Sequence, residues 1–143
     1  MTIRTMETAD IDRLAVLYAH FWGEASNVEK MRETFQRVRK NDAYVFLCAT
    51  VEDQVVGAVM GIVCEDLYGE CKPFLLLENM VIDDGHRRLG IGKALYHALE
   101  DWAREKGCKQ ISLLTESNRD DACGFYEALG FHPTASKGYK KKI

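Results

Sequence analysis

The segment that follows residue 82 combines glycine, arginine and lysine in an order that suits the binding of a phosphate group. An apolar run over 74–82, which predicts a strand, precedes the segment, and an amphipathic run over 90–106, which predicts a helix, follows. The first amides of a helix have no partner inside the helix, and glycines let a phosphate approach this backbone closely. The segment consists of Arg87, Arg88, Leu89, Gly90, Ile91, Gly92 and Lys93. A tight turn that needs two glycines for purely structural reasons would show the same glycine spacing.

Two known phosphate-binding motifs do not fit this segment. A P-loop requires Ser or Thr after its lysine, but Ala94 follows Lys93, and Arg87 stands where the first glycine belongs. A dinucleotide-binding fingerprint requires a third glycine, and that position is Leu95. The segment therefore predicts an anion site of another kind.

The pattern Arg-x-x-Gly-x-Gly, placed directly after a strand that ends in Glu-Asn-Met-Val-Ile, resembles the GNAT superfamily of acyl-CoA N-acyltransferases. A second block, from Asn118 to Phe131, resembles the Asn…Ala…Phe-Tyr-Glu-x-Leu-Gly-Phe block of the same family. One predicted helix and one predicted strand separate the two blocks, and the order of the predicted elements also matches the family. The resemblance therefore covers nearly the whole chain.

The resemblance implies acetyl-CoA as the co-substrate and a role for each matching segment, and we expect no metal ion because no zinc-ligand spacing is present. In the family, the strand before the turn splays from its neighbour, and its exposed backbone holds the pantetheine arm and the acyl group. That backbone belongs here to Met80, Val81 and Ile82, and an amide near the first two would polarise the thioester carbonyl. The turn from Arg87 to Lys93 would hold the pyrophosphate.

The second block assigns roles to an asparagine and a tyrosine. The resemblance implies that Asn118 helps to fix the cofactor arm and that Tyr126 lies near the thioester sulfur. The interval from Asn118 to Ala122 is one residue longer than in the family's common form, so either Ser117 or Asn118 faces the cofactor. Tyr126 is the candidate acid for the departing thiolate, although a phenol gives its proton to a thiolate uphill by about 2 kcal/mol. Packing of the ring is the structural alternative.

A carboxylate on the apolar strand could serve as the base that the amine nucleophile needs. Alkylamines are almost fully protonated at neutral pH, so the proton must leave before the nitrogen attacks a thioester. Glu78 stands within the apolar run and is expected to be partly desolvated, which makes a carboxylate a better base. Residues alternate faces along a strand, so Glu78 and Met80 are expected to point the same way, toward the cleft where the acyl group would lie. A glutamate paired with a nearby arginine is the structural alternative.

The order of the elements predicts a mixed α/β (α+β) fold in a single domain that spans 1–143. Strands are expected over 2–6, 43–51, 55–64, 74–82 and 111–115, helices from about 10 and over 28–40, 90–106 and 120–129, and an extended segment from 131. The resemblance implies a mixed, mostly antiparallel sheet with a central splayed strand, flanked by helices on both faces. The run over 74–82 is apolar on both faces for most of its length, which is typical of a covered central strand.

The composition argues against several classes of protein. The 143 residues are 47% hydrophobic, enough for one core, and the net charge of −3 argues against a general nucleic-acid binder. The basic residues near the C-terminus are interpreted as a solvated edge strand; they are Lys137, Lys140, Lys141 and Lys142. Neither a signal core nor a membrane-spanning run is present, so we expect a cytoplasmic protein without a membrane partner. The five cysteines match no zinc spacing and favour buried thiols in a reducing compartment.

Together these observations predict an N-acetyltransferase that moves acetyl from acetyl-CoA to a primary amine by direct transfer in a ternary complex. No cysteine stands in a recognisable nucleophile setting, which disfavours a covalent intermediate. A small-molecule amine is the favoured acceptor, and a protein Nα- or Lys-amine is the first alternative. A non-catalytic acyl-CoA sensor is the second, against which the presence of both Glu78 and Tyr126 speaks. The resemblance adds that homodimers are common in the family.

Overall fold

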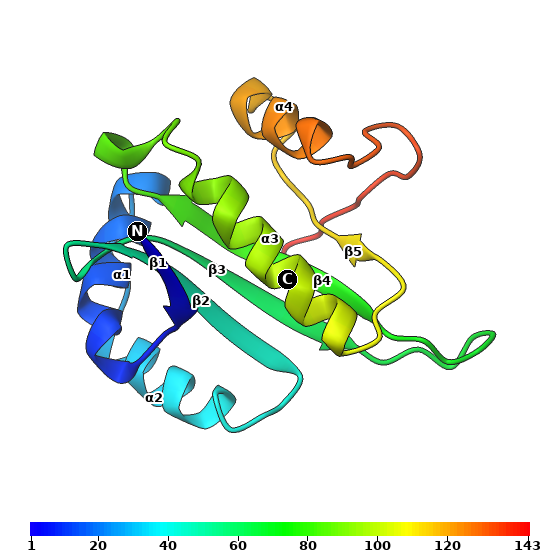
Figure 1. Ribbon diagram of the computed structural model, residues 1–143, viewed down its shortest axis with the longest axis horizontal. Helices are drawn as coiled ribbons and strands as arrows, with labels where there is room; N and C mark the ends of the chain where they lie inside the picture. Colours follow the sequence, from blue (N-terminus) through cyan, green and yellow to red (C-terminus); the bar gives the residue numbers. More distant parts are fainter. The chain divides into compact units, whose positions relative to one another are not determined.

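The computed structural model describes residues 1–143, which fall into two units, Met1–Ser112 and Leu113–Ile143. The strands of the first unit are β1 (Thr2–Thr5), β2 (Tyr44–Val51), β3 (Gln54–Cys64), β4 (Phe74–Ile82) and β5 (Ile111–Ser112). They form one sheet in the order β1-β2-β3-β4-β5, in which the neighbours are antiparallel except for the parallel pair β4 and β5 (Figure 1). The mixed, mostly antiparallel sheet predicted from the sequence is confirmed.

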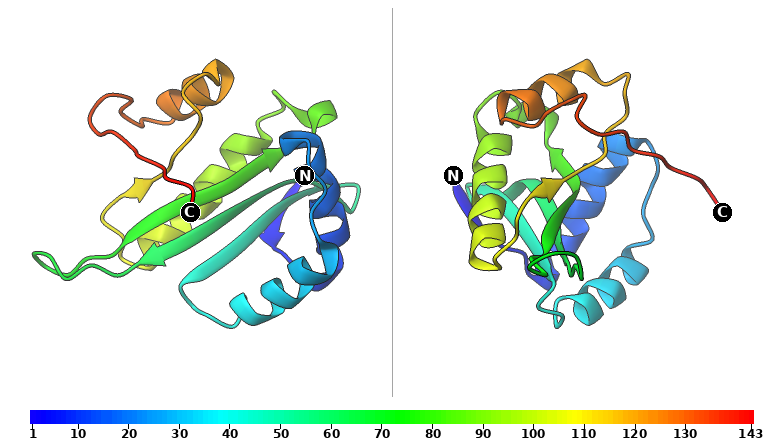
Figure 2. Two further views of the ribbon diagram at one scale, coloured as in Figure 1. Left: turned by 180° about the vertical axis from the view of Figure 1, so that it is seen from behind. Right: turned by 90° about the vertical axis from the view of Figure 1, so that its right-hand side faces the viewer.

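Helices cover both faces of this sheet. α1 (Ile11–Trp22) and α2 (Val28–Val38) lie on one face, and α3 (Ile91–Glu105) lies on the other, as the right-hand view of Figure 2 shows. Two short 3-10 turns, η1 (Thr8–Asp10) and η2 (Asp84–His86), precede α1 and α3. The core beneath α1 and α2 joins apolar residues of both helices to three strands; it includes Met6, Ile11, Leu14, Leu17, Phe35, Cys48, Val55, Ala58 and Val81. None of the helices is long and apolar enough to cross a membrane.

Local sequence signals account for the helix ends. α1 stops at Gly23, whose φ of 78° is left-handed and whose amide donates to Ala19 O at 2.8 Å. α2 begins after Asn27, whose side chain accepts from the Lys30 amide at 3.0 Å. The observed helices are one or two residues shorter than the predicted ranges at some ends, which is the usual uncertainty of a fraying terminus.

α3 packs closely on β3 because two glycines of that strand leave room for its side chains. A Cβ placed on Gly61 would lie 2.5 Å from Leu99 Cδ1 and 3.0 Å from Val45 Cγ1. A Cβ on Gly57 would lie 3.2 Å from Leu95 Cδ1. Leu95 and Leu99 are both fully buried, so the contact between this helix and the sheet has no spare volume.

β4 contains a β-bulge in its middle. The pairs Ala58–Val81 and Met60–Glu78 flank the bulge, so β4 has one residue more than β3 between them. Asn79 lies within the bulge and has a φ of 53°, in the left-handed region that asparagine tolerates better than most residues. The bulge therefore interrupts the regular alternation of side chains along the strand.

This interruption corrects one prediction. Glu78 and Val81 lie on the same face of the sheet, because their β3 partners are two residues apart. Met80 instead shares the face of Ile82, two residues further along β4. The prediction that Glu78 and Met80 point the same way is wrong, because it assumed a strand without a bulge.

β4 parts from β5 after a short stretch of pairing. The two strands pair only at Leu75 with Ile111 and at Leu76 with Ser112. β5 was predicted over 111–115 but ends at Ser112. From Leu77 onward the β5 side of β4 therefore has no strand partner within the first unit, which is the splayed central strand that the resemblance implied.

The second unit contains one helix, α4 (Asp120–Ala128). The Tyr126 ring lies edge-on to Phe125 and Phe131, at centroid distances of 5.1 and 5.7 Å, and Tyr126 O accepts from the Leu129 and Phe131 amides. No strand forms after α4, so the interpretation of the C-terminal lysines as an edge strand is wrong. Lys140 instead forms an exposed ion pair with Glu116, at 3.2 Å.

The close packing of α3 on β3 gives a stability prediction. Gly61→Ala should lower the free energy of unfolding by about 1–3 kcal/mol, because the new methyl group overlaps Leu99 and Val45. Gly85→Ala is the matched control, since its Cβ would have only an ordinary contact, at 3.5 Å from Asp83 Oδ2. Urea unfolding monitored by circular dichroism measures both. A Gly61→Ala protein as stable as the wild type would contradict the close approach of this helix to the sheet.

Candidate functional site

The candidate site of the first unit begins at the unpaired edge of β4. The Asp83 amide donates to Val56 O at 2.8 Å, on the β3 side. Hydrogen bonds alternate sides along an antiparallel strand, so the neighbouring amide of Ile82 is directed toward the β5 side. The Val81 side chain is buried beneath α1, and that of Ile82 is half-buried toward α3. These side chains anchor the strand, while its free edge offers backbone groups to a ligand.

The predicted anion turn lies between this strand and α3. Arg88 and Gly90 both have left-handed backbones, with φ of 62° and 81°, and α3 begins at Ile91. Ala94 donates to Gly90 O at 3.0 Å, and no side chain caps the helix start. The amides that precede Ala94 in the first turn of α3 thus have no partner in the helix, as an anion site requires.

The charged side chains of the turn differ in whether they form ion pairs. Arg87 forms an ion pair with Asp84 at 2.8 Å, and both side chains are largely exposed. Arg88 and Lys93 are exposed and form no ion pair. Ile91 is buried and fixes the start of α3, whereas Leu89 is 67% exposed at the tip of the turn. Two cations and several unused amides are therefore available at one helix N-terminus.

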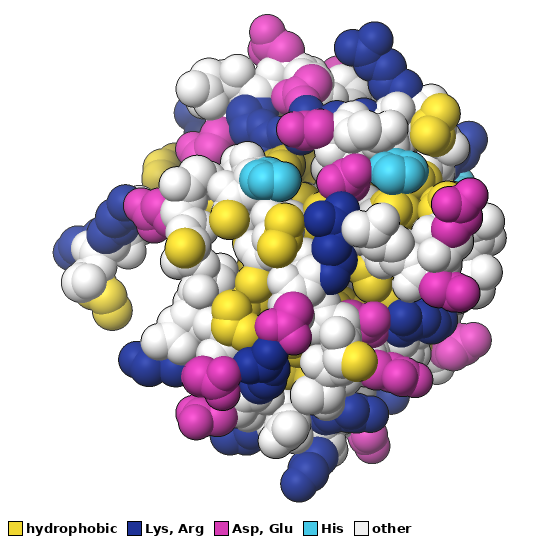
Figure 3. All heavy atoms as spheres, turned by 90° about the vertical axis from the view of Figure 1, so that its left-hand side faces the viewer, with side chains coloured by type: hydrophobic (Ala, Val, Ile, Leu, Met, Phe, Trp, Pro, Cys, Tyr) yellow, Lys and Arg dark blue, Asp and Glu magenta, His cyan; other side chains and the backbone are white.

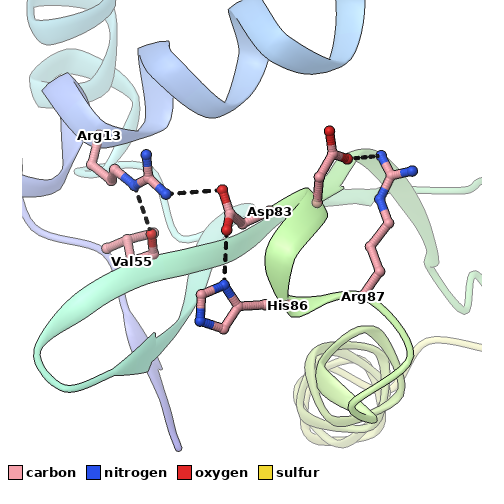
Figure 4. A network of polar contacts seen from close by, with 6 residues as sticks. Arg13, Val55, Asp83, His86 and Arg87 are labelled. Atoms are coloured by element: carbon pink, nitrogen blue, oxygen red, sulfur yellow. Dashed lines mark hydrogen bonds and ion pairs between the residues drawn. The ribbon is translucent and has the colours of Figure 1, made fainter.

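A polar network that the sequence analysis did not find holds the connection from β4 to this turn (Figure 4). Arg13 of α1 donates through Nε to Val55 O and through Nη2 to Asp83 Oδ1, both at 3.0 Å. The other carboxylate oxygen of Asp83 lies 2.8 Å from His86 Nδ1. Hydrogen bonding with His86, followed by the nearby charge of Arg13, lowers the pKa of Asp83. Arg13 and Asp83 are 70 positions apart, so no local pattern could have paired them.

Glu78 lies on the face of the sheet that carries α1 and α2. Its cross-strand partner is Met60, whose own partner on β2 is Phe46. The Phe46 ring packs against Phe35 of α2 at a centroid distance of 5.2 Å. Glu78 is half-buried and forms no ion pair with an arginine, so the structural alternative considered for it is not observed.

The remaining predicted site residues belong to the second unit. Ser117 and Asn118 are exposed in the turn before α4, where the Arg119 amide donates to Glu116 O at 3.1 Å. Tyr126 is half-buried within α4, among the rings described above. The first unit thus contains Glu78, the free β4 edge and the predicted anion turn, and the second unit contains Asn118 and Tyr126.

Other side chains add no second candidate site. No group of three or more His, Cys, Asp or Glu residues is arranged to hold a metal ion. All five cysteines are free, and burial raises the pKa of the Cys48 thiol to about 11, which makes it a poor nucleophile. On the face drawn in Figure 3, basic and acidic side chains are interspersed rather than gathered into a patch of one sign.

Comparisons with known proteins identify the class to which this fold and site belong. A family model described as the Acetyltransferase (GNAT) family matches residues 11–131. The aminoglycoside N(6')-acetyltransferase type 1 of Stenotrophomonas maltophilia is 27% identical over 135 residues, covering 93% of this chain and 87% of that protein. The glucosamine 6-phosphate N-acetyltransferase of Trypanosoma brucei brucei is 27% identical over 138 residues, covering 92% of this chain and 88% of that protein.

The crystal structure of a Trypanosoma brucei acetyltransferase superposes with a TM-score of 0.82 at 21% identity, covering 99% of both chains. At that identity the likeness bears on the fold alone. Several other relatives are longer proteins, of which this chain spans less than half. The chain belongs to the GNAT family of acetyltransferases, enzymes that use acetyl-CoA.

The network around Asp83 gives a prediction that depends on pH. Asp83→Asn should lower the free energy of unfolding at pH 7 by on the order of 1–3 kcal/mol, because Arg13 and His86 lose a charged partner. The pKa of Asp83 is lowered in the folded protein, so its contribution is complete above about pH 4 and is lost as the pH falls through the lowered value. The difference between variant and wild type should therefore shrink in acid.

Urea unfolding at pH 7 and at pH 3 measures this difference. Asp84→Asn is the control, because its exposed ion pair with Arg87 should contribute little at either pH. If Asp83→Asn were as stable as the wild type at pH 7, or if its loss of unfolding free energy were as large at pH 3 as at pH 7, the Asp83 carboxylate would not stabilise the segment between β4 and the turn.

Proposed function

We propose that this enzyme acetylates the primary amine of a small molecule by direct transfer from acetyl-CoA within a ternary complex. The observation that carries the proposal is the combination of an unpaired β4 edge with an uncapped helix N-terminus directly after it. A CoA thioester presents an extended amide-bearing arm and a pyrophosphate in the same order. The strand edge suits the arm, and the helix N-terminus suits the pyrophosphate.

The cofactor would contact a defined part of the chain. The backbone of Met80, Val81 and Ile82 would hold the pantetheine arm and the acetyl group. The turn would hold the pyrophosphate through the amides and charges of Arg87, Arg88, Leu89, Gly90, Ile91, Gly92 and Lys93. Asn118, rather than Ser117, would fix the arm from the second unit. The two free cations of the turn and its left-handed residues support this assignment.

The transfer needs one group to accept a proton and one to stabilise the leaving thiolate. Glu78 would take the proton of the amine, directly or through a water, so that the nitrogen lone pair can attack the thioester carbonyl carbon. A β4 amide would stabilise the negative charge on the carbonyl oxygen. The C–S bond then breaks, and the Tyr126 hydroxyl would donate a hydrogen bond to the sulfur. No cysteine takes part, which keeps the transfer direct.

A protein Nα- or Lys-amine is the alternative acceptor within the same chemistry, and a non-catalytic acyl-CoA sensor is the alternative without it. Thiol release from acetyl-CoA in the presence of an amine library separates an enzyme from a sensor. Peptides with a free α-amine or a lysine, included in the same screen, separate the two classes of acceptor. A chain that binds acetyl-CoA but releases no thiol with any amine would be a sensor.

The cofactor assignment predicts that Gly92→Asp weakens CoA binding by well over tenfold while the protein stays folded. A carboxylate at the start of α3 would repel the pyrophosphate and occupy the same amides. Calorimetric titration with CoA measures the affinity, and circular dichroism checks the fold. Gln36→Glu adds the same charge on the exposed side of α2 and should leave the affinity unchanged. If folded Gly92→Asp protein bound CoA with unaltered affinity, the assignment of the turn as the pyrophosphate site would be wrong.

The assignment of the base predicts a change in the pH–rate profile. Glu78→Gln should lower the rate most at neutral pH and least at high pH, where neutral amine is abundant without a base. Glu33→Gln, on the exposed side of α2, is the matched control and should leave the profile unchanged. A Glu78→Gln profile with the wild-type shape, merely scaled or not altered at all, would show that Glu78 is not the base.

The assignment of the leaving-group donor predicts that Tyr126→Phe lowers kcat more than it weakens CoA binding. Only the hydroxyl is lost, and its hydrogen bond to sulfur strengthens as charge develops during C–S cleavage. The phenylalanine ring can keep the edge-on contacts with Phe125 and Phe131, so stability should change little. We expect a loss of kcat near the low end of the 10²–10⁴-fold range typical of acid catalysis. If kcat stays within about threefold of the wild type, Tyr126 is a packing residue.

A further inference from the structure

One face of the sheet in the first unit carries an apolar surface that its helices do not seal. Alternate residues of β2, β3 and β4 form it beyond the part that α1 covers, and all of them are half-buried. We call this surface the open sheet face; its members are Tyr44, Phe46, Met60, Ile62, Cys64, Phe74 and Leu76. The register aligns them in cross-strand rows, of which Phe46–Met60–Glu78 is one.

The contrast with neighbouring rows and with the other face shows that the opening is local. The next row on the same face, Cys48–Ala58–Val81, is at most 2% exposed beneath α1. On the opposite face, beneath α3, Leu75 and Leu77 of the same strand are 0% and 3% exposed. β4 is therefore sealed on its α3 side over the stretch where its other side is only half-covered.

The strands that form the open sheet face carry few charges. Glu78 is the one ionisable carboxylate in its cross-strand rows. Asp66, beyond the end of β3, is engaged by Lys109 at 2.7 Å. On the α2 side, the exposed Arg39 places its guanidinium carbon 5.4 Å from the centroid of the Phe35 ring. The three strands thus combine a broad apolar surface with a single carboxylate, that of Glu78.

We infer that the acceptor is a primary amine carried on an apolar body, which lies on the open sheet face with its nitrogen at Glu78. This inference rests on the proposed function and names the substrate class of the same site. Each methylene group of an apolar acceptor that leaves water on binding raises the affinity by up to about fourfold. A second cation along the body would meet no second carboxylate on these three strands, and a phosphate would meet no Lys or Arg on them. Polycationic aminosugars and sugar phosphates are therefore poor acceptors for this chain.

A set of matched amines tests the substrate class with the wild-type enzyme. The acceptors are ethylamine, butylamine, hexylamine, hexane-1,6-diamine, kanamycin and glucosamine 6-phosphate. We expect kcat/KM to rise by roughly two- to fourfold per methylene from ethylamine to hexylamine. The kcat/KM for hexylamine should be about tenfold or more higher than that for hexane-1,6-diamine, which has the same length and one more charge. A kcat/KM independent of chain length, or higher for the diamine, kanamycin or glucosamine 6-phosphate than for hexylamine, overturns the inference.

A charge placed on the open sheet face tests where the acceptor lies. Ile62→Glu should lower kcat/KM for hexylamine and raise the preference for hexane-1,6-diamine by about tenfold or more, because the second ammonium gains a partner. Gln54→Glu adds the same charge at the exposed start of β3 and should leave the preference unchanged. Ile62→Thr, a smaller change, should lower kcat/KM for hexylamine alone. An unchanged preference in these folded Ile62 variants overturns the placement.

Binding of acetyl-CoA separates a failure of this inference from a failure of the proposed function. If the wild-type protein binds acetyl-CoA but acetylates no alkylamine, the acceptor class is wrong and the cofactor assignment stands. If the folded protein does not bind acetyl-CoA by calorimetry, the proposed function fails, and the inference fails with it.

Discussion

The extra residue in the middle of β4 is the constraint on which the candidate site depends. An antiparallel pair cannot absorb an additional residue without a local change of direction, and the left-handed backbone of Asn79 provides it. Beyond this point β4 still pairs with β3, but its other edge is free because β5 pairs only with Leu75 and Leu76. A strand interior normally hides its backbone groups, and here it offers them at the position where a thioester would lie. The bulge also sets which side chains share a face with Glu78.

Long-range contacts hold the connection from this strand to α3. The turn has two left-handed residues and exposed cations, and a chain segment of this kind would be mobile if nothing restrained it. Arg13 restrains it from α1, because one guanidinium bonds both the start of β3 and the carboxylate of Asp83. Asp83 in turn orients His86. The turn proposed as the anion site is thus restrained by the helix on the opposite face of the sheet from α3, so its geometry depends on the packing of the whole unit.

The two faces of the sheet differ in how completely helices cover them. α3 lies tightly against β3 because Gly57 and Gly61 remove the side chains that would hold it away. This tight contact fixes the N-terminus of α3, where the pyrophosphate would bind. The other face is closed only where α1 crosses it, and the aromatic contact of Phe35 with Phe46 is the limit of the cover from α2. The same sheet thus has one tightly packed face, where we propose the cofactor binds, and one partly open face, where we infer that the acceptor lies.

Hydrophobic periodicity, turn residues and two motif blocks were sufficient to predict most of the strands, the helices and the family. These signals are local, since each depends on residues a few positions apart that form one element.

The bulge at Asn79, the early end of β5 and the absence of a strand after α4 were not predicted, because pairing between strands decides them. The orientation of Glu78 relative to Met80 was predicted wrongly for the same reason. The link between Arg13 and Asp83 joins residues 70 positions apart, and the open sheet face exists only where three paired strands extend past a helix. The sequence by itself determined most of the elements and the family, whereas only the tertiary structure decided which side chains meet, because strand register and helix packing depend on contacts that no local pattern encodes.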